Sequence, residues 1–588
     1  MSRLPGSLDR HAAVLRAPGA SRGVLWRCDR CRPPVARPAL WDHVCHRRIR
    51  RGSGWRSSGG NPMADPGFPA PQRGSAGGAD GADRIRRWRG AMKNRGWLFL
   101  VTVGLLGLYA LALHRLTLYP PTWFDEGSHL HVPKALVRWG VYADYSSEGF
   151  RFSGPIFGVG PTVLLPIAGV FRLLGINLWP ARWVMVSYLL LSVSLFSVVA
   201  RRWVPGVGAA FAVLWFVFAR STDTITLGRQ ALGEVPGMAF LALGLMGWAR
   251  MAQGQKWGML LTGLGFGLAM ITKNQWGLFL IPGLIAMAIL GKVFYRHPSW
   301  LGNGIAAGIA LGLWGLWQGI LWGVLIPDPL RTMGELRQIA GGSVAAFPSP
   351  QMSATARSLL TVFDGALLPV ALYVLGKALQ RNPTGYRWGL IGMLAALNLG
   401  WLVVASNGWL RYAYPGLSLL SLGVGGMLED LWKQVRIHAL RWSIAGWLAL
   451  LLLGSAVIVV GRVIRQGDGS AFEMARYLRE QIPESARIET WEPEMMVLTD
   501  HRYHQPPQAL IDAAARFIWL GGPPPSVFYR WDVVQPDYVL VGAFGRWVQL
   551  YREVEETCIR PVAAFGPYRL YAPRECLSLA PNERSLQP

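Results

Sequence analysis

Long runs of apolar residues recur through most of the chain. Each is roughly 16 to 25 residues long, which is the length of α-helix that crosses the hydrocarbon core of a bilayer. Hydrophobic residues make up 52% of the 588 residues and charged residues only 16%, too few charges to cover the surface of a soluble protein of this length. The sequence therefore predicts a polytopic α-helical membrane protein.

The excess of positive charge follows these apolar runs. A formal net charge of +26 is compatible with nucleic-acid binding, but the Lys and Arg residues lie beside the apolar runs and in the N-terminal tail. This placement is typical of membrane topology, in which basic residues mark the cytoplasmic loops. We therefore expect the lipid bilayer, and not nucleic acid, to be a partner of the chain.

Residues 1–91 differ from everything that follows. They contain 18 Arg, no Lys and 6 acidic residues, and the stretch from Gly52 to Asp83 is rich in Gly, Ser, Pro and Ala. Such a composition buries too little apolar surface to fold, which predicts a disordered basic tail or sequence upstream of a true start at Met92. The tail also holds the residue types of a zinc knuckle, in Cys28-x-x-Cys31 and Cys45-His46, but no folded loop is expected to hold them as ligands.

Charge placement decides how many of the apolar runs cross the membrane. One run, residues 161–176, is interrupted by Pro166 and carries Arg172. If this run does not cross, the basic clusters of five later loops fall on the same side as Arg84 to Arg95, as the positive-inside tendency requires. We therefore expect 161–176 to be an amphipathic juxtamembrane helix on the outer interface. The expected spans are 97–118, 181–200, 204–219, 231–249, 257–272, 275–291, 300–326, 358–378, 388–405, 410–428 and 442–463.

These eleven spans predict the domain organisation. A transmembrane module covers residues 92–464, with its N-terminus in the cytoplasm, and residues 465–588 form an extracytoplasmic domain. That domain reads as mixed α/β, with a helix over 471–481, a buried strand over 537–541 and a hairpin over 557–571 that turns at Gly566-Pro567. Cys558 and Cys576 are the only cysteines after the tail and suit a disulfide in an oxidising compartment, two free thiols being the alternative.

The segment after the first span carries the strongest local signal for chemistry. Trp123-Phe-Asp-Glu-Gly-Ser-His129 places Asp125 and Glu126 next to each other, with His129 close behind, near the hydrocarbon boundary. Carboxylates at that depth are costly and tend to be functional. Asp125 also lies near the start of an expected amphipathic helix, so helix capping and catalysis both remain open.

Further charged residues occur at the expected outer ends of later spans. Glu234 lies in an apolar run and needs a partner such as Arg229 or Lys273, either in a structural ion pair or in a site. Lys273 and Arg411, the latter followed by Tyr412, are isolated cations near the outer face, where snorkelling to lipid phosphates is the alternative to binding a substrate. Cations converging beside acids would suit a substrate with an anionic phosphate and a reacting hydroxyl.

One group of glycines is interpreted as a helix-packing motif. Gly263-x-Gly-x-Gly267 lies inside an apolar run, with no strand before it and without the spacing of a dinucleotide-binding loop. We expect it to allow close approach of neighbouring helices.

Taken in order along the chain, these motifs resemble a known family. The W-F-D-E-G segment, then Gly160-Pro-Thr-Val-Leu-Leu-Pro166 and Phe171 to Gly175, is similar to the integral membrane glycosyltransferases of the GT-C fold. The nearest branch includes the protein O-mannosyltransferases and the aminoarabinose transferase of lipid A. The resemblance covers about residues 95 to 580 and extends through Ala181-Arg182, Arg201-Arg202-Trp203, Glu234, Lys273 and Arg411-Tyr412-x-x-Pro415.

This resemblance implies a function and roles for individual residues. The chain would transfer a sugar from a polyprenyl-phosphate-linked donor to an acceptor hydroxyl on the non-cytoplasmic face of the cell membrane, with inversion. Asp125 would be the general base, and Glu126 and Glu234 would orient the acceptor, stabilise the sugar or bind a divalent metal. Lys273, Arg411 with its neighbour Tyr412, and Arg229 would hold the phosphate.

The resemblance leaves the acceptor and the metal open, and one other function competes with transfer of a sugar. The acceptor is a lipid, a glycan or a protein, and the resemblance requires no nucleotide cofactor while leaving a divalent metal undecided. The competing function is a transporter or flippase of a lipid-linked or amphiphilic substrate, since intramembrane charges also suit a permeation path. A transporter needs such charges at mid-membrane and on both faces, whereas the transferase needs them on the outer face alone.

Overall fold

The computed structural model describes residues 101–573, apart from 344–346, 508 and 559, together with residues 96 and 99. The chain divides into two compact units, residues 1–78 and 79–588, and every described residue belongs to the second. The expected basic tail of residues 1–91, with its cysteines, lies outside the described residues, as does Cys576.

The first part of the second unit is a bundle of apolar helices. Five helical segments are both long and apolar enough to cross a membrane: α5, η1 with α10, α11 with η2, α15, and the segment from His438 that contains α17. Each of the eleven expected spans overlaps a described helix, but several of these helices are shorter than a full span. The bundle consists of a helix over Val101–Leu113, α5 (Leu178–Trp203), α6 (Gly206–Phe218), α7 (Thr224–Leu227), α8 (Glu234–Met251), α9 (Trp257–Thr272), η1 (Asn274–Trp276), α10 (Gly277–Val293), α11 (Trp300–Ile320), η2 (Leu321–Leu325), α12 (Pro329–Ser343), α13 (Met352–Leu360), η3 (Val362–Gly365), α14 (Leu367–Ala378), α15 (Pro383–Ala405), η4 (Leu410–Ala413), α16 (Tyr414–Gln434) and α17 (His438–Arg465).

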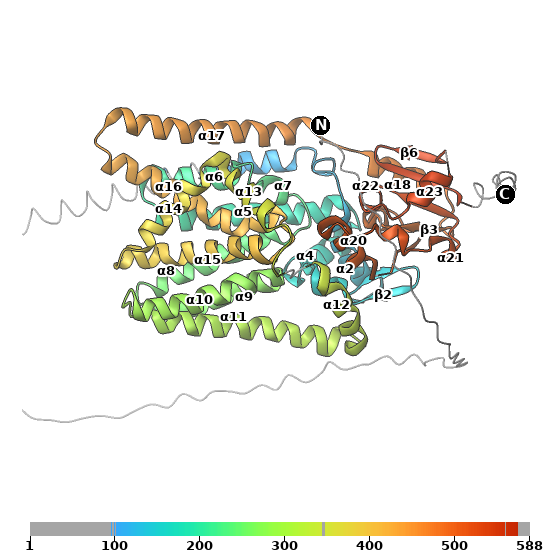
Figure 1. Ribbon diagram of the computed structural model, residues 1–588, viewed down its shortest axis with the longest axis horizontal. Helices are drawn as coiled ribbons and strands as arrows, with labels where there is room; N and C mark the ends of the chain where they lie inside the picture. Colours follow the sequence, from blue (N-terminus) through green and yellow to red (C-terminus); the bar gives the residue numbers. More distant parts are fainter. Residues whose placement is uncertain are drawn as a thin grey trace, which may run out of the picture. The chain divides into compact units, whose positions relative to one another are not determined.

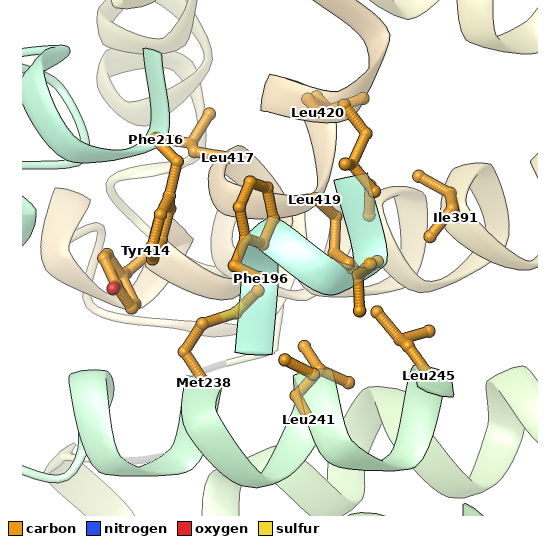
Figure 2. Close-up of a cluster of buried hydrophobic side chains, with 14 of the residues drawn as sticks. Phe196, Phe216, Met238, Leu241, Leu245, Ile391, Tyr414, Leu417, Leu419 and Leu420 are labelled. Atoms are coloured by element: carbon orange, nitrogen blue, oxygen red, sulfur yellow. The ribbon is translucent and has the colours of Figure 1, made fainter. Parts of the chain in front are cut away.

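The bundle has one continuous apolar core. Helices α5, α6, α8, α15 and α16 each direct large side chains into it, and the rings of Phe196 and Phe216 stack with centroids 4.3 Å apart. Figure 2 shows part of this cluster, in which Phe196, Phe216, Met238, Leu241, Leu245, Ile391, Tyr414, Leu417, Leu419 and Leu420 face one another.

Glycine allows the closest helix contacts. Helices α8, α9 and α11 lie side by side (Figure 1), and a Cβ on Gly265 of α9 would collide with the backbone of Gly244 on α8. A Cβ on Gly267 would lie 3.0 Å from Leu313 of α11. The interpretation of Gly263 to Gly267 as a packing motif is confirmed.

Two segments of the chain meet at one end of this bundle. The first is the loop after the Val101–Leu113 helix, and in it α2 packs against α4, which corresponds to the expected juxtamembrane helix. Its elements are α2 (Phe124–Trp139), β1 (Asp144–Ser146), β2 (Gly149–Arg151), α3 (Gly154–Phe157) and α4 (Pro161–Leu174).

The second segment follows α17 and contains a five-stranded mixed sheet in the order β4-β3-β5-β7-β6. Strand β3 pairs in parallel with β4 and β5, whereas β7 pairs antiparallel with β5 and β6. The predicted helix, strand and hairpin of this region all form, and the hairpin turns at Gly566, whose φ is 52°. The elements are α18 (Ser470–Gln481), β3 (Arg487–Thr490), α19 (Pro493–Leu498), β4 (Arg502–His504), α20 (Ala509–Leu520), η5 (Pro525–Val527), α21 (Trp531–Val534), β5 (Tyr538–Val541), α22 (Ala543–Trp547), α23 (Arg552–Thr557), β6 (Ala563–Phe565) and β7 (Tyr568–Tyr571).

Helix α2 joins the sheet segment to the bundle. On one side it packs against α4, and on the other against α19. Buried polar side chains of α2 bond to the α19 region: His131 Nε2 lies 2.8 Å from the carbonyl of Pro493, and Lys134 Nζ donates to the carbonyl of Thr499 at 2.9 Å. Asp125, in the first turn of α2, is thereby held between the two parts of the fold.

Candidate active site

A cavity of about 230 Å³ lies where the first loop, the ends of the bundle helices and the sheet segment converge. Its charged and titratable lining residues are Asp125, His129, Lys273 and Arg411. The remaining walls are mostly aromatic and apolar, formed by Trp123, Phe124, Val132, Pro155, Val159, Leu164, Leu232, Trp409, Tyr412, Trp491, Ala514, Ala515, Ile518, Phe544 and Trp547.

Asp125 faces a cation across this cavity. Helix α2 begins at Phe124 with Trp123 as its N-cap residue, so Asp125 occupies the first turn and is not the cap. Its Oδ2 forms an ion pair with Nη1 of Arg411, which lies in the short helix η4 between α15 and α16. Negative charge in a first helical turn is favoured by the helix dipole, and the pairing adds a second stabilising contact.

Three aromatic rings surround the guanidinium of Arg411. Its Cζ lies 4.5 Å from the ring centroid of Trp409, 5.2 Å from that of Tyr412 and 5.4 Å from that of Trp123. The guanidinium of arginine stays protonated at every pH at which proteins function, so Arg411 is a permanent positive charge among these three rings.

Glu234 and Lys273 form a second ion pair beside the first. Glu234 is the first residue of α8, and Lys273 directly follows α9 in an extended conformation. Lys273 Nζ donates to Glu234 Oε1 at 2.5 Å, and the two side chains are only 9% and 3% exposed. Glu234 Oε2 has no hydrogen-bond partner among the described residues.

The two ion pairs belong to one charged cluster. Tyr412 lies between them, because its ring centroid is 5.1 Å from Lys273 Nζ and 5.2 Å from the Arg411 guanidinium. A small second cavity is lined by Glu234, Lys273, Arg411 and Tyr412 together. The structure thus brings together five of the residues that the sequence singled out: Asp125, Glu234, Lys273, Arg411 and Tyr412.

His129 lies on the same wall, one helical turn after Asp125. Its Nδ1 is 2.7 Å from the carbonyl of Ala231, which can only accept, so Nδ1 carries the hydrogen. Burial lowers the pKa of His129, which keeps the ring neutral and leaves Nε2 as a hydrogen-bond acceptor beside the cavity.

Two other expected site residues lie elsewhere. Glu126 is fully buried behind the cavity, and its carboxylate accepts from Arg182 Nε at 2.9 Å, from Arg182 Nη2 at 2.5 Å and from the Ala231 amide at 3.2 Å. Arg229 is also fully buried and donates to the carbonyl of His114 at 2.6 Å, with the Tyr119 ring 5.6 Å away. Neither residue lines the cavity.

Only one of the two cysteines in the predicted disulfide lies among the described residues. Cys558 is buried and disulfide-bonded, whereas Cys576 lies outside the described residues. The pairing of Cys558 with Cys576 therefore stays a prediction.

The carboxylates do not form a typical divalent-metal site. Within the described part of the chain, no three His, Cys, Asp or Glu side chains gather as a set of metal ligands. Asp125 and Glu234 each face a cation, whose charge would oppose that of a metal ion.

The aromatic wall contributed by the sheet segment was not anticipated from the sequence. Phe124 stacks on Phe544 with ring centroids 3.9 Å apart and meets Trp491 edge-on at 6.1 Å. Trp547, which is 47% exposed, continues the same wall. The only local signal was the abundance of tryptophan, which interfacial anchoring explains equally well.

Comparison with known proteins supports the architecture. Residues 158–317 match the family model of the dolichyl-phosphate-mannose-protein mannosyltransferases. No curated protein matches the chain in sequence.

Solved structures match over most of the chain at low sequence identity. ArnT from Cupriavidus metallidurans bound to undecaprenyl phosphate is 14% identical with a TM-score of 0.57, over 81% of this chain and 98% of ArnT. The apo form of that protein gives a TM-score of 0.56 at 14% identity, over 82% of this chain and 98% of ArnT. The archaeal oligosaccharyltransferase AglB from Archaeoglobus fulgidus, in complex with an inhibitory peptide and a dolichol-phosphate, gives 0.51 at 11% identity, over 81% of this chain and 74% of AglB. The chain thus has the GT-C fold of the integral membrane glycosyltransferases.

Proposed function

We propose that this protein transfers a sugar from a polyprenyl-phosphate-linked donor to an acceptor hydroxyl on the non-cytoplasmic face of the cell membrane, with inversion at the anomeric carbon. The observation that carries this proposal is the convergence of Asp125 with two cations, Lys273 and Arg411, at one cavity. A carboxylate base and cations for a phosphate are the groups that such a transfer needs.

The reaction assigns a role to each of these groups. The acceptor oxygen attacks the anomeric carbon while its proton passes to the Asp125 carboxylate. The bond between the anomeric carbon and the phosphate oxygen breaks, and polyprenyl phosphate leaves with the electron pair. Lys273 and Arg411 stabilise the charge on that phosphate, which they do most effectively in a site that excludes water.

The ion pairs explain how donor binding would activate the base. Without substrate, the charge of Asp125 is neutralised by Arg411 and that of Glu234 by Lys273. A donor phosphate competes with Asp125 for Arg411, which weakens the pairing and makes Asp125 more basic. Asp125 is therefore most basic when the donor is bound.

The other expected residues receive different roles. His129 Nε2 accepts a hydrogen bond from a substrate hydroxyl, and Tyr412 holds Lys273 and Arg411 in their common arrangement. Glu126 and Arg229 support the fold around the site, because their side chains are buried among other partners.

The proposed topology has eleven spans, with the N-terminus in the cytoplasm and an α/β domain, residues 465–588, outside the membrane. It is supported by the side on which basic loops fall and by the helix found in each expected range. The charged site residues gather at one end of the bundle, as a transferase requires, whereas a transporter or flippase needs them along a path.

The structures with this fold suggest the chemical class of the donor. ArnT was solved with undecaprenyl phosphate and AglB with a dolichol-phosphate, both polyprenyl-type lipid phosphates. We infer the same class for this chain and leave the acceptor among lipids, glycans and proteins.

The test is turnover of the donor by purified protein in lipid nanodiscs. Undecaprenyl phosphates carrying different hexoses and pentoses are supplied in turn, and released undecaprenyl phosphate is measured by mass spectrometry. We expect wild-type protein to turn over at least one donor and Asp125→Asn to release it at least ~100-fold more slowly, the scale expected for a general base.

A matched control separates chemistry from loss of charge. Glu556→Gln removes an exposed carboxylate of the sheet segment, in an ion pair with Arg552, and should leave release unchanged. Equal release by wild type and Asp125→Asn would show that Asp125 is not the base.

A further inference from the structure

The short segment Trp491 to Glu494 connects the sheet segment to the cavity. Trp491 lines the cavity, whereas the next side chain, Glu492, is buried and 1% exposed. Pro493 and Glu494 pack directly against α2, where a Cβ on Gly127 would lie 2.7 Å from Cα of Glu494. This segment therefore touches both the wall of the site and the helix that begins beside Asp125.

Glu492 holds the first turn of α22 (Ala543–Trp547), the helix that carries Phe544 and Trp547 of the aromatic wall. Its Oε1 accepts hydrogen bonds from the amides of Gly542 at 3.0 Å and Gly545 at 2.7 Å, and its Oε2 accepts from the amide of Phe544 at 3.4 Å. A Cβ on Gly542 would lie 2.6 Å from the Glu492 carboxyl carbon, and one on Gly545 would lie 3.2 Å from Oε1. Glycine at both positions leaves the room that the carboxyl group occupies.

The first turn of α22 contacts the segment that carries Asp125 through the ring of Phe544. Phe544 stacks on Phe124 at 3.9 Å, and Phe124 is the residue before Asp125. Phe544 also meets Trp491 edge-on at 5.2 Å. A shift of Gly542–Gly545, which form the N-cap and first turn of α22, would therefore move both the wall of the cavity and the ring next to the proposed base.

A second buried carboxyl group lies against Glu492. Glu494 is 2% exposed, and its Oε1 accepts from the Tyr568 hydroxyl at 2.8 Å. Among the described residues neither Glu492 nor Glu494 forms an ion pair with a cation. Two carboxyl groups in such a place cannot both be charged at moderate cost, so at most one of them is ionised.

Further ionisable groups lie around the pair. Tyr568 of β7 donates to Glu494, and His131 of α2 bonds to the carbonyl of the intervening Pro493. Tyr551, between α22 and α23, lies near Glu492 and donates to the buried Glu489 of β3 at 2.9 Å. Burial raises the pKa of Glu492 to about 7, and burial together with the Glu492 charge raises the pKa of Glu494 well above its usual range. Glu494 thus keeps its proton while Glu492 ionises near neutral pH.

We propose that Glu492 is a positioning residue that holds the Phe544 turn against the cavity, and that its ionisation beside protonated Glu494 makes this hold depend on pH. An ionised carboxylate accepts stronger hydrogen bonds from amides than a protonated one. As the pH rises through about 7, the pKa of Glu492, the turn becomes more firmly held and the aromatic wall better ordered. The effect on catalysis rests on the proposed function, whereas the effect on the turn does not.

Hydrogen exchange measures the turn without any substrate. The full chain in nanodiscs is exchanged at several values between pH 5.5 and 8.5, and the rate of a peptide covering 541–548 is corrected for the intrinsic effect of pH. We expect its protection to rise roughly fivefold across the range, the effect of strengthening these bonds by charge. Protection that does not change with pH in wild-type protein overturns the proposal.

Variants identify the group responsible. Glu492→Gln cannot ionise, so the protection of 541–548 should be low and independent of pH, whereas Glu494→Gln mimics the protonated partner and should retain the pH dependence. The exposed Glu556→Gln is the matched control and should behave as wild type. Wild-type protection in Glu492→Gln overturns the assignment.

Donor turnover then tests whether the turn matters for catalysis. With any donor that wild type turns over, Glu492→Gln should lose the part of the pH profile near 7, while Glu494→Gln keeps it. A profile that Glu492→Gln leaves unchanged overturns the link between the turn and the site. If wild type turns over no donor but shows pH-dependent protection, the proposed function fails and the positioning role of Glu492 remains.

Discussion

The buried pair of Glu126 and Arg182 offers a sharp test of which acid does the chemistry. Both side chains are fully buried, and the guanidinium binds the carboxylate through two hydrogen bonds of 2.9 and 2.5 Å. Glu126→Gln preserves the shape but leaves the Arg182 charge without a counter-charge. Breaking a buried pair in this way costs about 3–5 kcal/mol, which is a large part of the stability of most proteins.

Replacing Arg182 as well should partly restore the stability that Glu126→Gln removes. In the double variant Glu126→Gln with Arg182→Met, no uncompensated charge remains, and the main loss is the bond from Arg182 Nη1 to the carbonyl of Leu116, 2.7 Å long. Leaving that carbonyl without a donor costs about 1–3 kcal/mol. The double variant should therefore be more stable than the Glu126→Gln single variant.

Stability is measured by denaturation in mixed micelles, with retention of the folded peak on size-exclusion chromatography as a second readout. Glu335→Gln is the control, because its ion pair with Arg331 is exposed and worth at most about 0.5 kcal/mol. If Glu126→Gln were as stable as wild type but at least ~100-fold slower in donor turnover, Glu126 would act in the reaction and the structural role would be wrong.

Three further predictions concern other parts of the molecule. Arg411→Lys keeps the charge but loses the planar group between the rings of Trp409 and Trp123, so donor turnover should fall about tenfold, against at least about 100-fold for Arg411→Met, measured as initial rates over a range of donor concentrations. Global unfolding brings Glu492 into water, where its carboxyl group has its ordinary pKa, whereas opening of the first turn of α22 alone leaves the group buried. Against global unfolding, the raised pKa of Glu492 therefore contributes stability that is complete below about pH 4.5 and lost as the pH rises to about 7; a denaturation series should show this loss, of order 3 kcal/mol, and Glu492→Gln should flatten it. Reduction should lower stability by about 3 kcal/mol if Cys558 is bonded to Cys576, and peptide mass spectrometry without reductant would reveal a different partner.

Much of the fold follows from local patterns in the sequence. The apolar runs, the glycines from Gly263 to Gly267 and the hairpin turn at Gly566 were all predicted, because each depends on a short stretch of chain and the solvent or neighbour that it must meet. The charged residues of the site were found for the same reason. Charges next to apolar runs are costly, so Asp125, Glu234, Lys273 and Arg411 stood out without knowledge of their partners.

The sequence did not determine which acidic side chain would pair with which basic side chain. Adjacent acids diverge: Asp125 faces Arg411 at the cavity, whereas Glu126 faces the buried Arg182. Side chains on consecutive helical residues point in directions about 100° apart, and only the packing of α2 between α4 and α19 decides which direction leads to the cavity.

The sequence by itself determined that this chain lies in a membrane and which of its residues are too polar for their surroundings, because hydropathy and charge act locally. Only the tertiary structure decided that the turn bearing Phe544, held by Glu492, completes the wall of a site that begins at Asp125. Those contacts join segments far apart in the chain, and they arise from the docking of α2 against α19, which no local pattern encodes.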